Sequence, residues 1–472
     1  MRSVSQLIPS GPDRSRRAIA NRRANRTVRR VLKRWKSLIA FVLLAANGFA
    51  QPPAAAEAMR LAREGAAAAD AQDFPTYLAK MEAAVALRPD FPRILTNLAA
   101  AQLANGHDDD AIATLNRLAA LGVHSPVDKS EEFVALRGRK EFTAVVAKLA
   151  KNLEGIGEAD IAFTVPEMTG VIEGVAWREK TGDFFFGDVY NRAVWLRTKD
   201  KKVRRFSAED DAVFGMFGLA VDEESGALWG ATSAVPSMRG YANDLDGAAG
   251  LAEFDLDSGA LRRVVRVPAT HDHQTHVLGD LALAPDGGIF LPDSGAPVLW
   301  WLPPRAAELA VFAESPEFLS LQGVIVTPEF GALLVADHAN GLLRVDLTTH
   351  AVRRLESPPD TTLIGLDGLV RAPNGDVIAI QNGLKPARVL RLTLDANGEA
   401  VTAVKVLESA HLNMPAPALG CIATGGDLFF IGNAGWSRFE GEDIQPTAPR
   451  PVPIFRTKLA EKGTTKNTKD TK

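Results

Sequence analysis

The clearest pattern in this chain is a repeat of apolar strands and polar turns between residues 174 and 434. Each repeat reads as an apolar strand, a tight polar turn and a second apolar strand that ends in a polar residue. The repeats begin at Gly174, Gly218, Asp280, Gly323, Gly368 and Gly420. They recur at intervals of roughly 43 to 62 residues, which is the spacing expected for the blades of a β-propeller.

Further strands follow these hairpins and complete a four-stranded unit. Third strands include AVWLRT and LAEFDL, and fourth strands include KVRRF and LRRVVRV. The pattern predicts a mainly β protein in which residues 158–459 form a six-bladed β-propeller. A segment near IAFTV or PIFRTK is expected to close the ring, and the polar tail at 460–472 is expected to be disordered.

Residues 51–157 follow a helical period instead. They are rich in Ala and Leu and show the spacing of amphipathic helices. Two segments align at an offset of 34 residues, which resembles two degenerate tetratricopeptide repeats, and a generic helical bundle is the alternative. Asp108 is expected to cap one helix. We predict a small all-α domain that folds separately from the propeller, with a boundary near residues 155–157.

The first 50 residues resemble an export signal. Residues 1–36 carry about twelve Lys and Arg and one acid, Asp13, and an apolar run follows at 37–50. This order matches a secretory signal with Gly48 and Ala50 at the cleavage positions. The apolar run is short for a stable membrane span, and a basic nucleic-acid-binding arm is the competing interpretation. The prediction is a periplasmic or secreted protein.

Charge and cysteine content narrow the expected partners. The chain has a formal net charge of −3, and the leader carries about +11, so the remainder is near −14 (−3 minus 11). An acidic body argues against nucleic acid or an anionic membrane as a partner. Cys421 is the one cysteine, so no intrachain disulfide can form. Its apolar strand marks it as a small buried hydrophobe.

The propeller topology brings six sequence positions to one mouth of the ring. The first strand of each hairpin is innermost, so the residue just before each repeat points toward the axis. These residues are Glu173, Phe217, Gly279, Gln322, Asp367 and Leu419. Glu173, Gln322 and Asp367 supply two carboxylates and an amide for one divalent cation. Calcium is the first choice and magnesium, manganese or zinc are alternatives. Polar lining of a water-filled channel is the competing interpretation.

The second strands end at the same mouth. Their terminal polar residues are Asp188, Thr232, Asp293, Asp337, Asn382 and Asn433. Asp, Asn and Thr are common in turns because their side chains bond nearby backbone groups. We therefore interpret Asp188, Asp293 and Asp337 as turn residues. Asn382 shares a blade with Asp367 and is expected to contact a substrate.

A histidine cluster precedes the third repeat. His271, His273 and His276 lie in the segment THDHQTHVLGD. A zinc site is one interpretation, and solvated loop histidines are the other. His276 and Asp280 are candidate substrate contacts. No G-x-S-x-G motif occurs in the sequence, so a serine hydrolase of that type is unsupported.

At these residues the chain resembles the senescence marker protein, gluconolactonase and luciferin-regenerating enzyme family of six-bladed propellers. The resemblance covers about residues 160–458. It rests on IEGVAW at Glu173, LQGVIVTPEFGALLVADH at Gln322 and LDGLVRAPNGDVIAIQNG at Asp367. In the family, the matching Glu, Asn and Asp bind one divalent cation, and the Asp also acts as the base.

Two residues depart from the family pattern. The family's blade-four Asn is Gln322 here, which keeps an amide oxygen one methylene further out. The family's substrate-side Asn in blade three falls on Gly279, with Asp280 next to it.

The resemblance implies hydrolysis of a lactone or a related ester. A cation held by Glu173, Gln322 and Asp367 would polarise the carbonyl, and Asp367 would be the catalytic base. Phe217 and His276 would shape the pocket. The alternative is a non-catalytic binding or scaffold protein of the cell envelope. A propeller joined to helical repeats offers two interaction surfaces, one of them for a protein partner.

Overall fold

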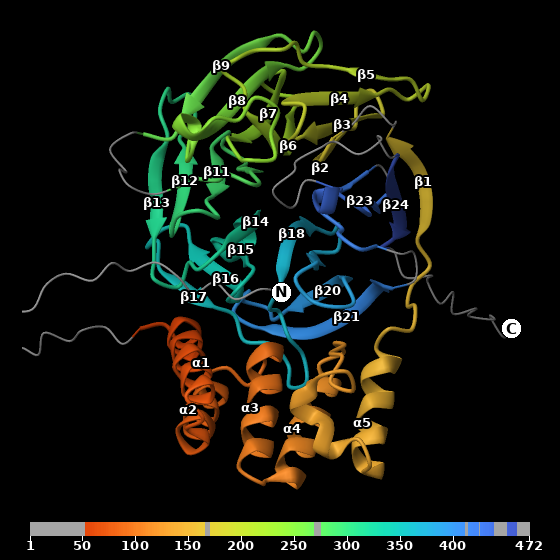
Figure 1. Cartoon of the computed structure of the whole chain (residues 1–472). Coiled ribbons are helices and arrows are strands. Elements are labelled where there is room, and N and C mark those ends of the chain that lie inside the picture. The colour runs from red at the N-terminus through yellow and green to blue at the C-terminus, as the bar shows by residue number, and fades with distance from the viewer. Residues whose placement is uncertain are drawn as a thin grey trace, which may run out of the picture. The chain divides into compact units, whose positions relative to one another are not determined.

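The computed structural model describes residues 52–165, 170–268, 275–410, 414–423, 425–438 and 451–459. The expected signal segment at 1–50, the tail at 460–472, and the histidines 271 and 273 lie outside these residues. Along the chain, helices come first and strands follow (Figure 1). Within the described ranges, no helix has the length and apolar character needed to span a membrane.

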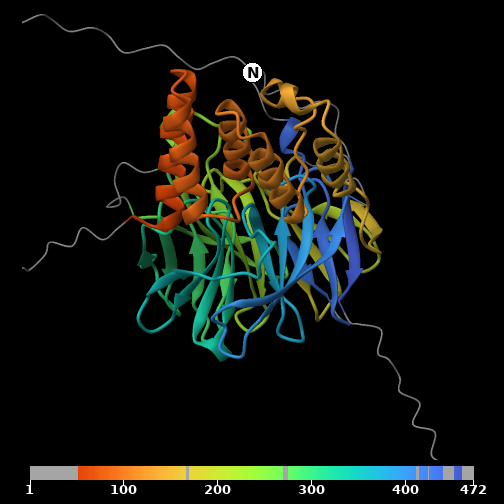
Figure 2. The ribbon, with the colours of Figure 1, turned by 90° about the horizontal axis from the view of Figure 1, so that it is seen from below.

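The described residues before 152 form helices. These are α1 (Ala54–Asp70), α2 (Phe74–Leu87), α3 (Pro92–Ala104), α4 (Asp108–Ala120), the 3₁₀-helix η1 (Glu131–Leu136) and α5 (Lys140–Lys151). The α-helices lie side by side (Figure 2) around a shared apolar core that includes Met81, Leu95 and Leu115. The helical prediction is confirmed, and the tetratricopeptide assignment stays a prediction.

The start of α4 differs by one residue from the expected position. His107 occupies the N-cap, and Asp108 is the first helical residue. Asp108, Asp109 and Asp110 therefore fill the first turn, where negative charge complements the helix dipole.

The strands in the described residues form six four-stranded antiparallel sheets around a common axis (Figure 1). From the inner to the outer strand, blade one is β2 (Ile172–Arg178), β3 (Asp183–Asp188), β4 (Ala193–Arg197) and β5 (Val203–Arg205). Blade two is β6 (Gly215–Asp222), β7 (Ala227–Ser233), β8 (Ala249–Asp255) and β9 (Leu261–Arg266). Blade three is β10 (Ala282–Leu283), β11 (Ile289–Pro292), β12 (Val298–Leu302) and β13 (Ala310–Glu314).

Blades four to six continue in the same order. Blade four is β14 (Leu321–Thr327), β15 (Ala332–Asp337), β16 (Gly341–Asp346) and β17 (Val352–Arg354). Blade five is β18 (Leu366–Arg371), β19 (Val377–Gln381), β20 (Arg388–Leu394) and β21 (Val401–Ser409). Blade six is β22 (Gly420–Ile422), β23 (Asp427–Ile431), β24 (Val452–Lys458) and β1 (Asp160–Val165). Each expected hairpin is present, so the six-bladed fold is confirmed. Short 3₁₀ turns lie in the loops at η2 (Asn243–Leu245), η3 (Pro328–Phe330) and η4 (Trp436–Arg438).

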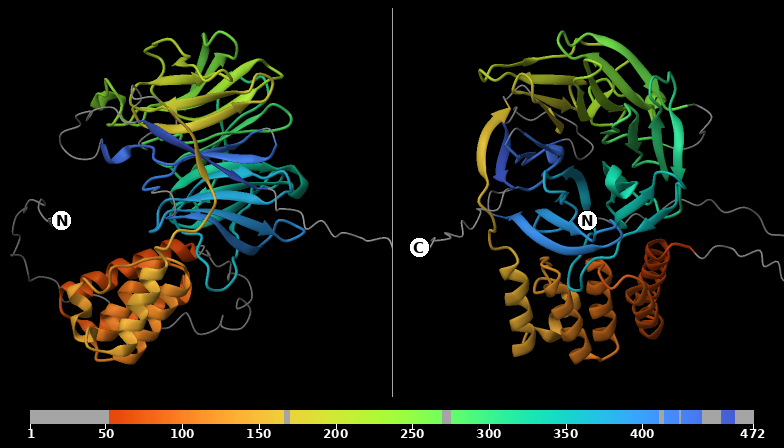
Figure 3. Two further views of the ribbon diagram at one scale, coloured as in Figure 1. Left: turned by 90° about the vertical axis from the view of Figure 1, so that its right-hand side faces the viewer. Right: turned by 180° about the vertical axis from the view of Figure 1, so that it is seen from behind.

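Both segments that the sequence marked for ring closure take part in it. PIFRTK lies in β24, and IAFTV lies in β1, which pairs with β24 along its length (Figure 3). An ion pair between Arg456 and Asp160 at 2.9 Å supports this ladder. The first strand of the propeller thus forms the outer strand of its last blade, and this pairing joins the two ends of the ring.

Apolar side chains fill the spaces between the blades. One core cluster joins Phe186 of blade one to Leu251, Leu291 and Ile431 of other blades. Trp300 is fully buried in the same cluster. Burial of large apolar side chains contributes about 1.5–3 kcal/mol each, so the packing between blades is the main force that holds the ring.

We expect the propeller to fold without the helices, because its strands all follow residue 159 and β1 closes the ring with β24. A chain starting at Glu158 should keep the circular dichroism of a β protein. Its melting temperature should fall, because buried Arg388 loses the Leu121 and Gly122 carbonyls to which Nη1 donates at 3.1 and 3.3 Å. A truncated chain that is wholly unfolded while the full chain is stable would show that the two parts fold as one unit.

Candidate functional site

β-Bulges mark the start of four inner strands in the described chain. The strand registers shift between Ile172 and Gly174, Met216 and Leu219, Leu321 and Val324, and Leu366 and Leu369. A bulge leaves its extra residue unpaired and redirects that side chain. The shifted positions contain Glu173, Phe217, Gln322 and Asp367. These four residues therefore lie outside the regular strand pairing, at one mouth of the ring.

Glycines next to the bulges let neighbouring inner strands approach each other closely. A Cβ on Gly174 would lie 2.0 Å from the Phe217 carbonyl oxygen. A Cβ on Gly323 would lie 2.5 Å from the Asp367 carbonyl oxygen. No larger residue fits against backbone at such distances. The repeated glycine thus sets how near the bulged residues of adjacent blades come to one another.

Glu173 is partly buried at this mouth, and its Oε2 atom is enclosed and, within the described chain, unsatisfied. Its Oε2 atom has no hydrogen-bond partner among the described residues. Burial and the negative charge of Asp367 raise the pKa of Glu173 to about 8, although a hydrogen bond with Trp436 acts in the opposite direction. A buried carboxylate oxygen without a partner is costly. A proton, a water molecule or a cation would satisfy this oxygen.

Asp367 lies close to Glu173 and is held by an amide. Asn382 donates from Nδ2 to Asp367 Oδ2, and the same nitrogen donates to the Pro417 carbonyl at 2.9 Å. Burial raises the pKa of Asp367, whereas the Asn382 bond and the positive charge of His338 lower it. The structure therefore places the expected base and the expected substrate contact side by side.

Gln322 is the second residue of β14, the inner strand of blade four. Its Nε2 donates to Ser320 Oγ at 3.2 Å, so the amide oxygen is the atom that can ligate a cation. The described residues, which exclude 271 and 273, contain no group of three His, Cys, Asp or Glu side chains placed to hold a metal. A cation at the mouth would therefore need Glu173, Asp367 and neutral oxygens such as this amide.

Asn382 occupies a different register from the expected one. The sequence pattern placed Asn382 at the position of Asp337, but the pairing in blade five gives that position to Gln381. His338 therefore corresponds to Asn382. A shift of one residue moves a side chain to the other face of a strand. This shift explains why Gln381 is buried while Asn382 reaches Asp367.

His338 is a site residue that the sequence analysis did not single out. It directly follows β15, and its charge acts on Asp367. Gly383 makes room for its ring, because a Cβ at this glycine would lie 2.4 Å from His338 Nε2. The sequence feature that could have identified His338 is its position one residue after a strand, which is equivalent to the position of Asn382.

An aromatic pair lies beside Glu173. Phe217 is 5% exposed, and its ring centroid lies 6.2 Å from that of Trp436 with the planes 29° apart. Trp436 belongs to η4 and also hydrogen-bonds Glu173. Phe217 lies where the sequence placed it. Trp436 was missed because it follows the last repeat, where no periodic pattern continues.

Asp280 and His276 lie in different surroundings. Asp280 accepts the Val324 N–H at 3.3 Å. Burial raises the pKa of Asp280 to about 7, and the charge of Asp367 acts in the same direction. His276 instead directs Nδ1 to Asp293 Oδ2 at 2.6 Å. The charge of Asp280 thus interacts with that of Asp367, whereas His276 is hydrogen-bonded within blade three.

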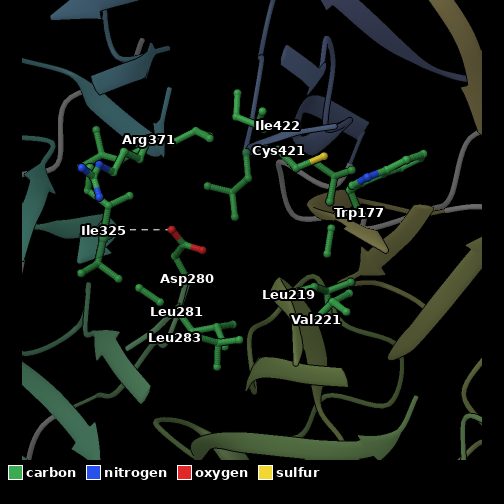
Figure 4. A pocket seen from close by; sticks show the side chains of 18 of the residues that line it. Trp177, Leu219, Val221, Asp280, Leu281, Leu283, Ile325, Arg371, Cys421 and Ile422 are labelled. Carbon is green, nitrogen blue, oxygen red and sulfur yellow. Dashed lines mark hydrogen bonds between the residues drawn. The ribbon is translucent and has the colours of Figure 1, made fainter. Parts of the chain in front are cut away.

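A cavity of about 340 Å³ lies between the inner strands, and Asp280 points into it (Figure 4). Most of its lining residues have apolar side chains, among them Leu219, Ile325 and Leu369. Leu369 lies two residues after Asp367 on the same strand. The cavity therefore adjoins the acidic mouth along the axis of the ring.

The strand-end aspartates serve the turns, as their sequence context indicated. Asp188 accepts from Trp195 Nε1 at 2.9 Å, and Asp293 accepts from Trp300 Nε1 at 3.0 Å. Each also accepts backbone N–H groups of the adjoining loop, as does Asp337. These carboxylates are satisfied within their own blades, in contrast to Glu173.

Comparison with known proteins adds structural neighbours. No protein-family model and no curated protein sequence matches the chain. Luciferin-regenerating enzyme shows 14% identity over 61% of this chain and 92% of its own, with a TM-score of 0.44. A gluconolactonase from Xanthomonas campestris shows 16% identity over 62% of this chain and 88% of its own, with a TM-score of 0.41. Virginiamycin B lyase from Staphylococcus aureus shows 11% identity over 64% of this chain and 100% of its own, with a TM-score of 0.42. The strand pairing of the chain establishes that it is a six-bladed β-propeller. It is structurally similar to luciferin-regenerating enzyme and gluconolactonase.

Proposed function

We propose that this chain is a metal-dependent hydrolase of lactones or related esters, with Glu173, Gln322 and Asp367 as its cation-binding side chains. The observation that carries the proposal is Glu173 Oε2, a buried oxygen that lacks a partner in the described part of the chain and lies near a second carboxylate. Two neighbouring, partly buried carboxylates repel each other. A proton or a divalent cation relieves this repulsion.

The donor set fits a hard divalent cation. Two carboxylates and an amide oxygen suit calcium first, and magnesium or manganese next, with water completing the shell. Zinc is a further candidate, although it is more often bound by nitrogen and sulfur. When bound, the cation would polarise the carbonyl group of the ester.

Asp367 is the proposed base. It would accept a proton from the attacking water, with its orientation set by Asn382 and its ionised form favoured by His338. The water oxygen bonds to the carbonyl carbon, the ester C–O bond breaks, and the proton passes to the leaving oxygen. Phe217 and Trp436 form an aromatic wall beside Glu173, and Asp280 is a candidate acceptor for a substrate hydroxyl.

We also propose export of the chain, on the evidence of its basic and apolar first 50 residues. The substrate is then a small molecule of the periplasm or the medium, and the helices are available to a protein partner.

One divalent cation should bind the purified protein at the mouth. Glu173→Gln keeps the side-chain volume and removes one charge, so the affinity should fall at least about tenfold, or about 1.4 kcal/mol. Calorimetric titration with calcium and with manganese measures this. Glu179→Gln, an exposed acid in the β2–β3 turn, is the matched control. Absence of binding to the wild type, or equal binding to Glu173→Gln, would refute the site.

Stability should depend on pH through the same carboxyl group. An unfolded Glu releases its proton near 4.5, whereas folded Glu173 retains it to about 8. Without a cation, the free energy of unfolding should therefore decrease as pH rises through this window. Cation affinity should increase over the same window, because the proton must leave first. Urea unfolding across the window, with chelator or with calcium, tests both trends, and Glu173→Gln should flatten them.

Hydrolysis should depend on Asp367. Asp367→Asn should reduce turnover of a reactive lactone or aryl ester by roughly 10²–10⁴, the range for loss of a positioned proton acceptor. A chelator should abolish turnover, and added cation should restore it. A panel of lactones and aryl esters assayed with calcium, magnesium, manganese and zinc makes the measurement. Turnover that is absent, or unchanged in Asp367→Asn, would favour the binding or scaffold protein.

The mature chain should begin near Gln51 in the native cell envelope. The basic leader, the apolar run and the small residues Gly48 and Ala50 place the cleavage there. Mass spectrometry of the fractionated protein identifies its first residue. An intact Met1 in a cytosolic fraction would contradict export.

A further inference from the structure

The segment after α2 contacts the loop between β15 and β16. Arg88 is fully buried and lies 2.9 Å from Asp90 in an ion pair. Its Nη1 donates to Asn340 Oδ1 at 2.9 Å, and its Nη2 donates to the Asn340 carbonyl at 3.4 Å. Asn340 lies two residues after His338. A buried, multiply bonded arginine therefore holds the loop that presents this histidine.

The segment after α4 contacts Arg388, the first residue of β20. Arg388 is 5% exposed, and its Nη1 donates to the Leu121 and Gly122 carbonyls. These carbonyls lie at the C-terminal end of α4, where the helix dipole favours a cation. The Nε of Arg388 donates to Gln381 Oε1 at 2.7 Å. Gln381 directly precedes Asn382, so this arginine connects a helix end to the second side chain beside Asp367.

Arg388 makes these bonds at an electrostatic disadvantage. Burial lowers the pKa of Arg388 to about 10. Its hydrogen bonds go to neutral oxygens, and a buried charge of this kind contributes less to stability than well-packed apolar side chains would. Its geometric effect is specific, because the planar guanidinium joins two partners in fixed directions.

The two loops also touch each other. The Gly365 N–H donates to the His338 carbonyl at 2.8 Å, and the Gly383 N–H donates to the Gly365 carbonyl at 3.1 Å. The His338 ring lies against Gly383, in space that a Cβ atom on this residue would occupy. Movement of either loop would therefore change how His338 and Asn382 meet Asp367.

We infer that Arg88 and Arg388 are positioning residues through which the helices hold His338 and Asn382 against Asp367. The helical part is then a component of the site, in addition to any partner it binds. This inference rests on the proposed site, and it does not require the proposed reaction.

The experiment uses the full chain with Arg388→Met, which keeps the apolar stem and removes every guanidinium bond. The affinity for Mn²⁺ should fall about tenfold or more, the usual effect of losing a group that orients a ligand. Arg388→Lys should recover part of the affinity, because an ammonium still meets the carbonyls at the end of α4. The resonance of the His338 ring, followed in histidine-labelled protein and assigned with His338→Gln, should shift in Arg388→Met.

Arg178→Met is the matched control. Arg178 is 8% exposed and bonds Glu223 at 3.0 Å at the far end of blade one. Its loss should lower the melting temperature and leave Mn²⁺ affinity and the His338 resonance unchanged. The inference is overturned if Arg388→Met and Arg88→Met lower only the melting temperature, as purely structural contacts would. If the wild type binds no Mn²⁺, the proposed cation site fails. The His338 resonance then decides alone, with a shift in Arg388→Met but not in Arg178→Met supporting the inference and no shift overturning it.

Discussion

The close approach of the inner strands at the axis is the constraint on which the site depends. At Gly174 and Gly323 the neighbouring backbone lies where a Cβ would be, so any side chain there would push two blades apart. The bulges just before these glycines turn Glu173, Gln322 and Asp367 out of their ladders. Each of these polar residues is followed by a glycine. Because the ring is closed, polar side chains from blades far apart in the sequence come together at the axis.

Convergence of two carboxylates in a packed ring has electrostatic consequences. Close packing around these groups leaves them little freedom to separate, and a proton or a cation would reduce the repulsion between them. The neighbours of the two groups differ. Asp367 receives the Asn382 bond and the charge of His338, whereas Glu173 retains an oxygen without a partner among the described residues. Burial raises the pKa of both acids, and the Asn382 bond that orients Asp367 is the reason we propose Asp367 as the base and Glu173 as a ligand.

The helices add a second level of order to this site. The loops that follow β15 and β19 carry His338 and Asn382. Arg88 bonds the first of these loops, and Arg388, at the start of β20, bonds the residue just before Asn382. Loops gain precision only when their backbone is tied to rigid elements. Both arginines are buried, and each connects the end of a helix to the propeller. The charge of Arg388 is therefore explained better by the geometry it imposes than by the stability it contributes.

The sequence by itself determined the blades, the helical segment and the mouth positions, because strand alternation, turn residues and helical spacing are local properties. It also brought Glu173, Gln322 and Asp367 to one mouth, since ring topology follows from the repeat. Tertiary structure alone decided the rest. The β18–β19 turn is one residue shorter than the β14–β15 turn, so it matched His338 with Asn382, and packing brought Trp436 to Glu173. Arg88 meets Asn340 across 252 residues of chain. Such contacts depend on how distant segments pack, and no local periodicity encodes them.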